Sequence, residues 1–194
     1  MPRLFAALEL PDDLAHDLAQ LRGGLFGAKW IEESDLHLTL RFIGDIDARF
    51  AAEIEDELAD IRKPAFPLTL ERLDWFGGER PREIIVKAKA TPELVTLQAK
   101  IETVMRRLGA PPEPRKFSPH VTLARLKGAR VDDVVHYLAG RGNFHTAPFT
   151  VPRFVLLSSR DSVGDGPYLT EEVFPLREEI TPHAAHEAME KSLL

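Results

Sequence analysis

The segment Leu36-His37-Leu38-Thr39-Leu40 returns 83 residues further along the chain as Pro119-His120-Val121-Thr122-Leu123. In each copy apolar residues alternate with polar ones, which is the pattern of a half-buried β-strand. Successive side chains of a strand point to opposite faces, so the apolar residues are expected to face a core. His37 and Thr39 then share the other face, and His120 and Thr122 do the same in the second copy.

Two histidines that each have a hydroxyl beside them suit acid–base chemistry on a phosphate. One imidazole can take up a proton while the other gives one, and a threonine hydroxyl can donate to a phosphate oxygen. The chain has seven His, and only His37 and His120 are followed two residues later by Thr. We interpret the repeat as one paired site; the alternative is two ordinary strand residues with no joint role.

The composition is that of a globular protein, and 194 residues predict one domain or two small packed lobes. There is no Cys, so disulfides, thiol nucleophiles and thiolate metal sites are excluded. The apolar run at the start is too short for a signal peptide, and no stretch approaches the ~20 apolar residues of a membrane span. We expect a cytoplasmic protein that does not bind membranes and, since no helix face is apolar beyond the needs of a core, a monomer.

Charge is distributed unevenly along the chain. The net charge of −6 argues against a protein that coats nucleic acid through a generally basic surface. Residues 45–60 carry seven acidic residues and one basic residue, whereas residues 105–130 carry seven basic residues and one acidic residue. His120 lies inside the basic stretch, where a local positive field could steer a phosphate toward it. The alternative is an ordinary solvated surface.

Periodicity and turn residues predict an α+β organisation. The predicted strands are 3–10, 36–43, 66–74, 83–90, 117–124, 144–151, 153–159 and 168–174. The predicted helices begin after Pro11, at Asp47, at Thr91 and at residue 132. Each half repeats a helix, a His-x-Thr strand, a helix and paired strands, which indicates two related lobes. Without a strict β-α-β rhythm the sheet is expected to be mostly antiparallel.

With their flanks, these motifs resemble the two-histidine phosphoesterase superfamily, and within it the bacterial and archaeal RNA 2′,3′-cyclic phosphodiesterases, historically called 2′-5′ RNA ligases. The similar stretches are residues 3–11, 29–31 with 36–44, 117–125, and Ser158-Ser159 with Gly166-Pro167-Tyr168. The resemblance implies a bilobal domain over residues 1–177, with pseudo-symmetric lobes, helices outside and both motif strands lining a central cleft. Residues 178–194 are expected to form a C-terminal tail.

The resemblance also implies the chemistry: hydrolysis of RNA 2′,3′-cyclic phosphate ends to 2′-phosphates. His37 would be the proton donor and His120 the proton acceptor, while Thr39 and Thr122 hold the phosphate. The partner would be RNA with such an end, tRNA fragments being one candidate, and neither a cofactor nor a metal is required. From the residues alone, either histidine could take either role.

Four further residues are candidates for substrate binding. Arg125 matches the family's arginine after the second motif, although strict alternation puts it opposite His120 unless the strand ends or bulges there. The same counting puts Arg41 on the face of His37. Tyr168 and Phe42 could stack on a base, as aromatic residues do in proteins that bind single-stranded RNA; core packing is the alternative for Phe42.

Other functions stay open at this point. The same residues could join RNA ends as a 2′-5′ bond or act on small cyclic nucleotides, and the fold could serve as a non-catalytic RNA-binding module. His183 and His186 in the tail have the spacing of metal ligands on a helix, but no third ligand is evident. We therefore expect no metal site there.

Overall fold

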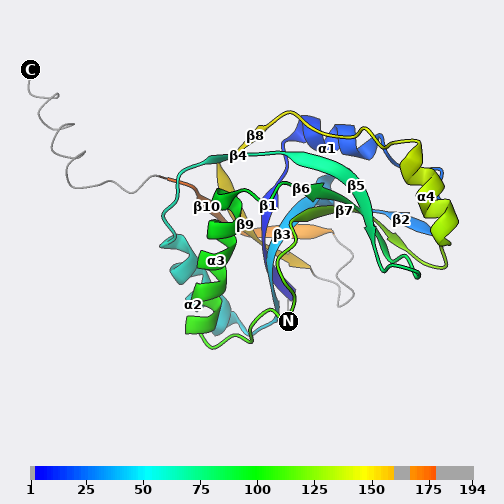
Figure 1. Cartoon of the computed structure of the whole chain (residues 1–194). Coiled ribbons are helices and arrows are strands. Elements are labelled where there is room, and N and C mark those ends of the chain that lie inside the picture. Colours follow the sequence, from blue (N-terminus) through cyan, green and yellow to red (C-terminus); the bar gives the residue numbers. More distant parts are fainter. Residues whose placement is uncertain (1–2, 160–166, 178–194) are drawn as a thin grey trace, which may run out of the picture.

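The computed structural model describes residues 3–159 and 167–177 (Figure 1). The helices are α1 (Asp12–Ala19), the 3₁₀ turn η1 (Glu33–Asp35), α2 (Ala48–Ala59), α3 (Pro92–Arg107) and α4 (Val131–Ala139). The strands are β1 (Arg3–Glu9), β2 (Ala28–Trp30), β3 (His37–Asp45), β4 (Phe66–Leu68), β5 (Leu70–Phe76), β6 (Glu83–Ala88), β7 (His120–Leu126), β8 (Phe149–Val151), β9 (Arg153–Ser159) and β10 (Tyr168–Pro175). The α+β class predicted from the sequence is confirmed.

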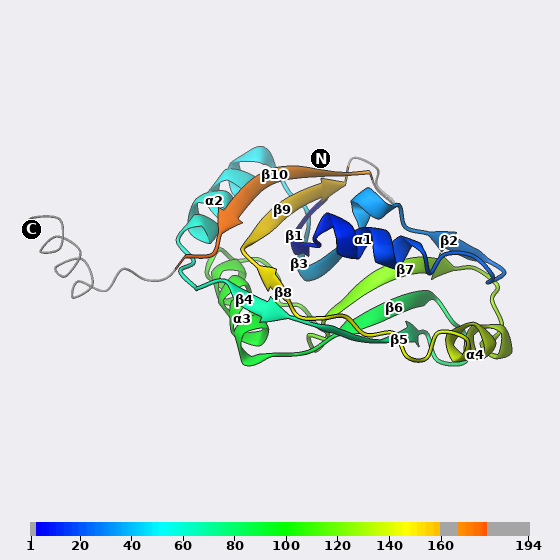
Figure 2. The same cartoon turned by 90° about the horizontal axis from the view of Figure 1, so that it is seen from above.

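One large sheet organises the molecule. Its strand order is β10-β9-β1-β3-β7-β6-β5, with β2 paired to β7, and the strand pairs within the described residues are antiparallel. The short strands β4 and β8 form a separate two-stranded sheet. Helices α2 and α3 lie side by side at one end, and α4 packs against β5 at the other (Figure 2).

The two motif strands, β3 and β7, meet at the centre of this sheet. They pair at one register position, Leu38 opposite Val121. On one side of this seam β3 continues into β1, β9 and β10, which we call the first lobe; on the other side β7 is flanked by β2 and β6, and β5 completes the second lobe. The sequence therefore predicted correctly that each lobe contributes one motif strand to a shared centre.

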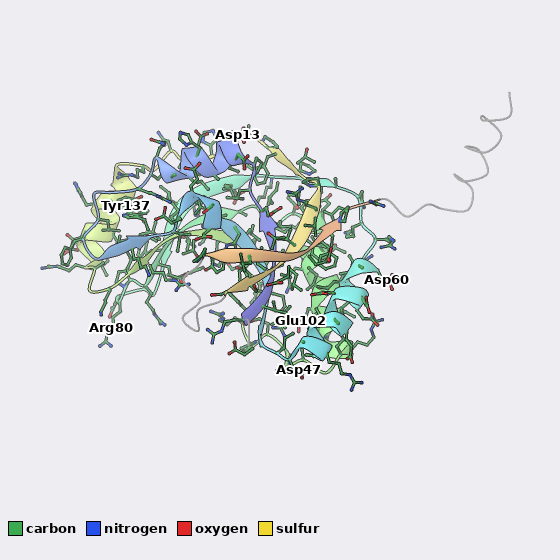
Figure 3. The ribbon with its side chains drawn as sticks, turned by 180° about the vertical axis from the view of Figure 1, so that it is seen from behind. Asp13, Asp47, Asp60, Arg80, Glu102 and Tyr137 are labelled. Atoms are coloured by element: carbon green, nitrogen blue, oxygen red, sulfur yellow. The ribbon has the colours of Figure 1, made fainter. Side chains whose placement is uncertain are left out.

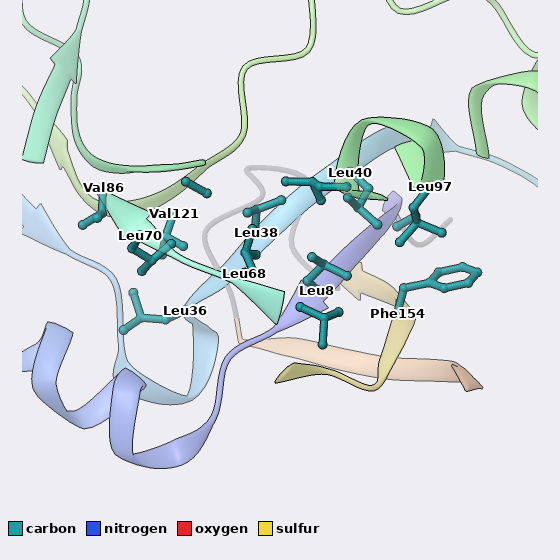
Figure 4. Close-up of a cluster of buried hydrophobic side chains, with 14 of the residues drawn as sticks. Leu8, Leu36, Leu38, Leu40, Leu68, Leu70, Val86, Leu97, Val121 and Phe154 are labelled. Carbon is teal, nitrogen blue, oxygen red and sulfur yellow. The ribbon is translucent and has the colours of Figure 1, made fainter. Parts of the chain in front are cut away.

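The core lies behind the motif strands, on the face opposite the histidines. Leu38, Val121, Leu70 and Val86 have no exposed surface, and they converge with leucines of β1 and α3 (Figure 4). Thr91 caps α3 as predicted, since its side chain accepts from the backbone N–H of Leu94. Burial of these alternate residues is what turns the polar members of the motif strands to the other face.

We expect Leu38→Ala to destabilise the protein by about 3 kcal/mol, because it leaves a cavity at the register pair that joins the lobes. Urea denaturation followed by circular dichroism measures the decrease in the free energy of unfolding. Leu169→Ala, at a partly exposed residue of the edge strand β10, is the matched control. A decrease below about 1 kcal/mol for Leu38→Ala would contradict this role.

Several elements differ from the prediction. The single strand predicted over 66–74 is two strands, because β4 pairs with β8 in the small sheet whereas β5 pairs with β6 in the large sheet. The second motif strand begins at His120 rather than residue 117, because Pro119 has no N–H to donate to a ladder. The strand expected over 144–151 shortens to β8, since the chain before it makes turn and loop hydrogen bonds, Thr146 N–H to Leu70 O among them. Strand β2 was not predicted, because three residues are too few to show a pattern.

Some expectations are not tested by this fold. No helix within the described ranges is long and apolar enough to cross a membrane. The monomeric state, the cytoplasmic location and the domain limits 1–177 and 178–194 stay predictions. His183 and His186 lie outside the described residues.

Candidate active site

A β-bulge in β3 decides which side chains accompany His37. Thr39 lies opposite Ala7 and Arg41 opposite Ala6, so Leu40 has no partner on β1. The extra residue shifts the alternation by one position. Phe42 therefore joins His37 and Thr39 on the cleft face, and Arg41 turns to the core face. The expectation that Arg41 shares a face with His37 is wrong, because strict alternation takes no account of the bulge.

The second motif strand carries a bulge at the equivalent position. Thr122 lies opposite Ile85 and Ala124 opposite Ile84, which leaves Leu123 without a partner on β6. Arg125 is thereby returned to the face of His120 and Thr122. The sequence left open whether the strand ends or bulges before Arg125, and the structure shows that it bulges. Both bulges follow the threonine directly, so the motif strands share one local geometry.

A cavity of about 640 Å³ lies over these faces and brings the predicted residues together. Six Arg or Lys and three Asp or Glu line it, so it is positively charged in a protein of net charge −6. Such a cavity attracts an anion. The lining includes all the site residues predicted from the sequence, namely His37, Thr39, Arg41, Phe42, His120, Thr122, Arg125 and Tyr168.

Backbone carbonyls orient both imidazole rings in the same way. Nδ1 of His37 lies 2.8 Å from the carbonyl oxygen of Asp35, and Nδ1 of His120 lies 2.7 Å from that of Ser118. A carbonyl only accepts, so each Nδ1 carries the hydrogen and donates. In the neutral ring, Nε2 is then the atom that can take up a proton. The hydroxyl of Thr39 lies 3.1 Å from Nε2 of His37 and can donate to it.

Aromatic side chains fix the rings from the side. Tyr168 meets His37 edge-on, with ring centroids 5.0 Å apart, and Phe5 packs against His37 at 5.0 Å. Phe76 meets His120 edge-on at 4.8 Å. Phe76 was not predicted as a site residue, because only the pairing of β5 and β6 with β7 reveals it.

Asp35 is a second residue that the sequence did not single out. Its carboxylate accepts from the backbone N–H of Tyr168 at 3.2 Å, while its carbonyl accepts from His37. The turn η1 thus ties the start of β10 to the strand that carries His37. Trp30, an aromatic residue of the similar stretch 29–31 that could have stacked on a base, packs on Tyr137 and is absent from the cavity lining.

The environment of His37 favours the neutral ring. The pKa of His37 is lowered from 6.5 to about 4, mainly by burial. The hydrogen bond and the charge of Asp35 oppose this shift, whereas the charges of His120 and Arg125 add to it. Burial also raises the pKa of Tyr168, so its phenol stays protonated at neutral pH. Because neighbouring cations contribute to the shift at His37, an anion bound between them would oppose it.

We expect this shift to appear as a pH dependence of stability. Between pH 7 and 4.5 the unfolded chain gains a proton at His37 that the folded protein does not bind, so the free energy of unfolding falls as pH falls. His37 should account for about 2 kcal/mol of that fall. The measurement is urea denaturation at both pH values for the wild type and His37→Asn. Equal decreases in the two proteins would show that His37 does not titrate as stated.

Arg41 holds the protein together behind the cleft. It is 6% exposed, and its Nε donates to Oε2 of Glu102 at 2.5 Å. Glu102 lies on α3 and is labelled in Figure 3. Its other nitrogens donate to the carbonyls of Phe42 and Pro111. The guanidinium therefore joins β3 to α3 and to residues 109–119, the connector to the second motif strand. These bonds use three of the five N–H groups of a side chain that the sequence-based prediction assigned to substrate.

The structure thus brings a pair of imidazoles, two threonines and an arginine to one positively charged cavity, which is the arrangement expected of a two-histidine phosphoesterase. Comparison with known proteins agrees: residues 10–162 match the model of the 2′-5′ RNA ligase superfamily. Since this match spans most of the chain, the protein belongs to that superfamily, as its motifs implied.

Individual relatives show how far the similarity extends. The chain is 41% identical over 104 residues to the RNA 2′,3′-cyclic phosphodiesterase of Aeropyrum pernix, a match that covers 53% of this chain and 59% of that protein. It is 28% identical over 183 residues to the enzyme of the same name from Methanothermobacter thermautotrophicus, covering 90% and 98%. Escherichia coli LigT complexed with NADP+ superposes with a TM-score of 0.71 at 23% identity, covering 91% and 98%, and shows the shared fold.

Proposed function

We propose that this protein hydrolyses RNA 2′,3′-cyclic phosphate ends to 2′-phosphomonoesters by acid–base catalysis between two histidines, without a metal or a cofactor. The observation that carries the proposal is the matched pair of rings, each held by a carbonyl on Nδ1, in one positively charged cavity. The relatives named RNA 2′,3′-cyclic phosphodiesterase support the choice of substrate.

In the proposed reaction, water attacks the phosphorus while Nε2 of His120 takes up one of its protons. The bond from phosphorus to the 3′ oxygen breaks, and His37 as imidazolium gives that oxygen a proton. The product keeps the phosphate on the 2′ oxygen. The two rings then hold the reverse protonation states, and exchange with solvent restores them.

Three side chains serve the phosphate in this proposal. The hydroxyls of Thr39 and Thr122 donate to its non-bridging oxygens. Arg125, on the same face because of the bulge, neutralises the charge that develops on those oxygens. Anionic substrate also raises the pKa of His37, which prepares the ring to act as the proton donor.

Two aromatic side chains are proposed to hold the base. Phe42 is 46% exposed and lines the cavity, and Tyr168 lines it on the side of His37. A ring face of this kind stacks on any base, which suits a site that reads an RNA end rather than a sequence.

The test is a short RNA with a 2′,3′-cyclic phosphate end, incubated with the protein in EDTA. We expect an RNA 2′-phosphate, identified because alkaline phosphatase removes it whereas a 3′-specific phosphatase does not. The same RNA with a 3′-phosphate end is the control and should stay unchanged. A 3′-phosphate product would contradict the bond choice, and no product in EDTA with recovery on adding metal would contradict metal independence. Added RNA with a 5′-hydroxyl reports ligation as a joined product.

A further inference from the structure

The cavity extends well beyond the two histidines. From His37 a row of rings leads through Phe5 to Phe42, with successive centroids 5.0 and 5.8 Å apart. The connector also lines the cavity and contributes Arg115 and Lys116. The connector therefore adds two basic side chains to the cavity, and the reaction proposed above gives them no role.

The connector is held in position by the buried side chain of Arg41. Arg41 donates to the carbonyl of Pro111 and lies 4.0 Å from the carboxylate of Glu113. Glu113 in turn accepts from Nε of Arg115 at 3.3 Å. Charged contacts thus run from the protein interior to the cavity wall and hold the segment with Arg115 and Lys116 in position. These contacts leave N–H donors of Arg115 and Lys116 for a ligand.

The charges at this end do not cancel. Arg41 is paired with Glu102, and Glu113 is shared between Arg41 and Arg115. Lys116 has no ion pair or hydrogen bond within residues 3–159 and 167–177. A positive charge on an exposed, anchored segment, in a cavity that also has an exposed aromatic ring, fits a nucleotide phosphate.

We propose that Arg115 and Lys116 form a subsite for the phosphodiester that links the last two nucleotides of the RNA. This inference rests on the proposed function. With the cyclic phosphate between the histidines and the terminal base on Phe42, the next charged group of the strand is that phosphodiester. The substrate class is therefore an oligonucleotide of at least two residues, and a cyclic mononucleotide leaves the subsite empty.

The first experiment compares two substrates, adenosine 2′,3′-cyclic phosphate and the adenosine dinucleotide with the same end. We expect the wild type to prefer the dinucleotide, and Arg115→Ala/Lys116→Ala to lower the ratio of the two kcat/KM values about 10-fold or more. Arg106→Ala/Lys89→Ala removes the same charge from exposed positions outside the cavity and should leave the ratio unchanged. A variant ratio equal to that of the wild type would overturn the proposal.

A second substrate separates a phosphate contact from a change of structure. In this dinucleotide the internal linkage is an uncharged methylphosphonate. It should lower kcat/KM of the wild type to the level of the double variant and leave the double variant unaffected. The slope of log kcat/KM against log salt should also flatten by about 0.7 for each phosphate charge that the protein no longer neutralises.

The outcomes distinguish this inference from the proposed function. If the wild type hydrolyses both substrates equally well, the subsite is wrong and the function stands. If it hydrolyses neither the mononucleotide nor the dinucleotide, the proposed function fails as well. If Arg115→Ala/Lys116→Ala reduces activity equally on both, the segment only supports the fold of the cleft, and the subsite is again overturned.

Discussion

Replacing either histidine with alanine is expected to lower kcat for hydrolysis of the cyclic phosphate about 10³-fold. Each replacement removes one proton transfer that the reaction requires, and such a transfer is worth about 10²–10⁴-fold. His37→Ala and His120→Ala should fold like the wild type, because both side chains line a cavity rather than the core. The measurement is the initial rate on an RNA with a 2′,3′-cyclic phosphate end.

The double variant sharpens this expectation. If the two rings act in one concerted step, His37→Ala/His120→Ala should be little slower than either single variant, because the first replacement already removes most of the coupled catalysis. His136→Ala, at an exposed position on α4, is the matched control and should keep full activity. Single variants within about 3-fold of the wild type would reject histidine acid–base chemistry and favour the alternative of an RNA-binding module.

The main features of the fold and the site follow from local patterns. Strict alternation across His37 to Leu40 and across His120 to Leu123 predicted both strands and the face of both histidines. Thr91 followed by Pro92 predicted the start of α3 to the residue. Such patterns depend on burial and backbone geometry within a few neighbouring residues, and the sequence alone is therefore enough to predict them.

Prediction by strict alternation fails at the two β-bulges. In the second copy Leu123 and Ala124 are consecutive apolar residues, a break in alternation that is consistent with a bulge. In the first copy the equivalent residues are Leu40 and Arg41, so a charged side chain hides the same break. Its guanidinium can lie on the core face because Glu102 and two carbonyls satisfy it there. Those partners are far away in sequence, and alternation cannot reveal them.

The supporting residues were beyond prediction for a related reason. Phe76 reaches His120 through two strand pairings, and Asp35 reaches Tyr168 across the first lobe. Burial that lowers the pKa of His37 likewise comes from the whole cleft rather than from neighbours in sequence. The meeting of the two histidines on one face could thus be predicted from their own segments, whereas the pKa of His37 depends on tertiary contacts.

The division of labour between the histidines needs a probe of the leaving group. A pH profile cannot separate the two assignments, because protonated His37 with neutral His120 and the reverse arrangement bind the same number of protons. The lowered pKa of His37 bears on this question, since a proton donor must first be protonated. A substrate that needs no proton donor resolves it.

Sulfur in place of the bridging 3′ oxygen is expected to restore His37→Ala by about 10²-fold and to leave His120→Ala as slow as before. A thiolate, the anion of a group with a pKa of about 8.5, departs without protonation, so removal of the acid matters little while removal of the base still does. The comparison needs both substrates with the wild type and both variants, under single-turnover conditions so that product release does not mask the chemical step. Rescue of His120→Ala instead would reverse the roles. Equal rescue of both variants would show that neither ring is dedicated to the leaving oxygen, and that the matched carbonyl contacts on Nδ1 reflect two interchangeable histidines.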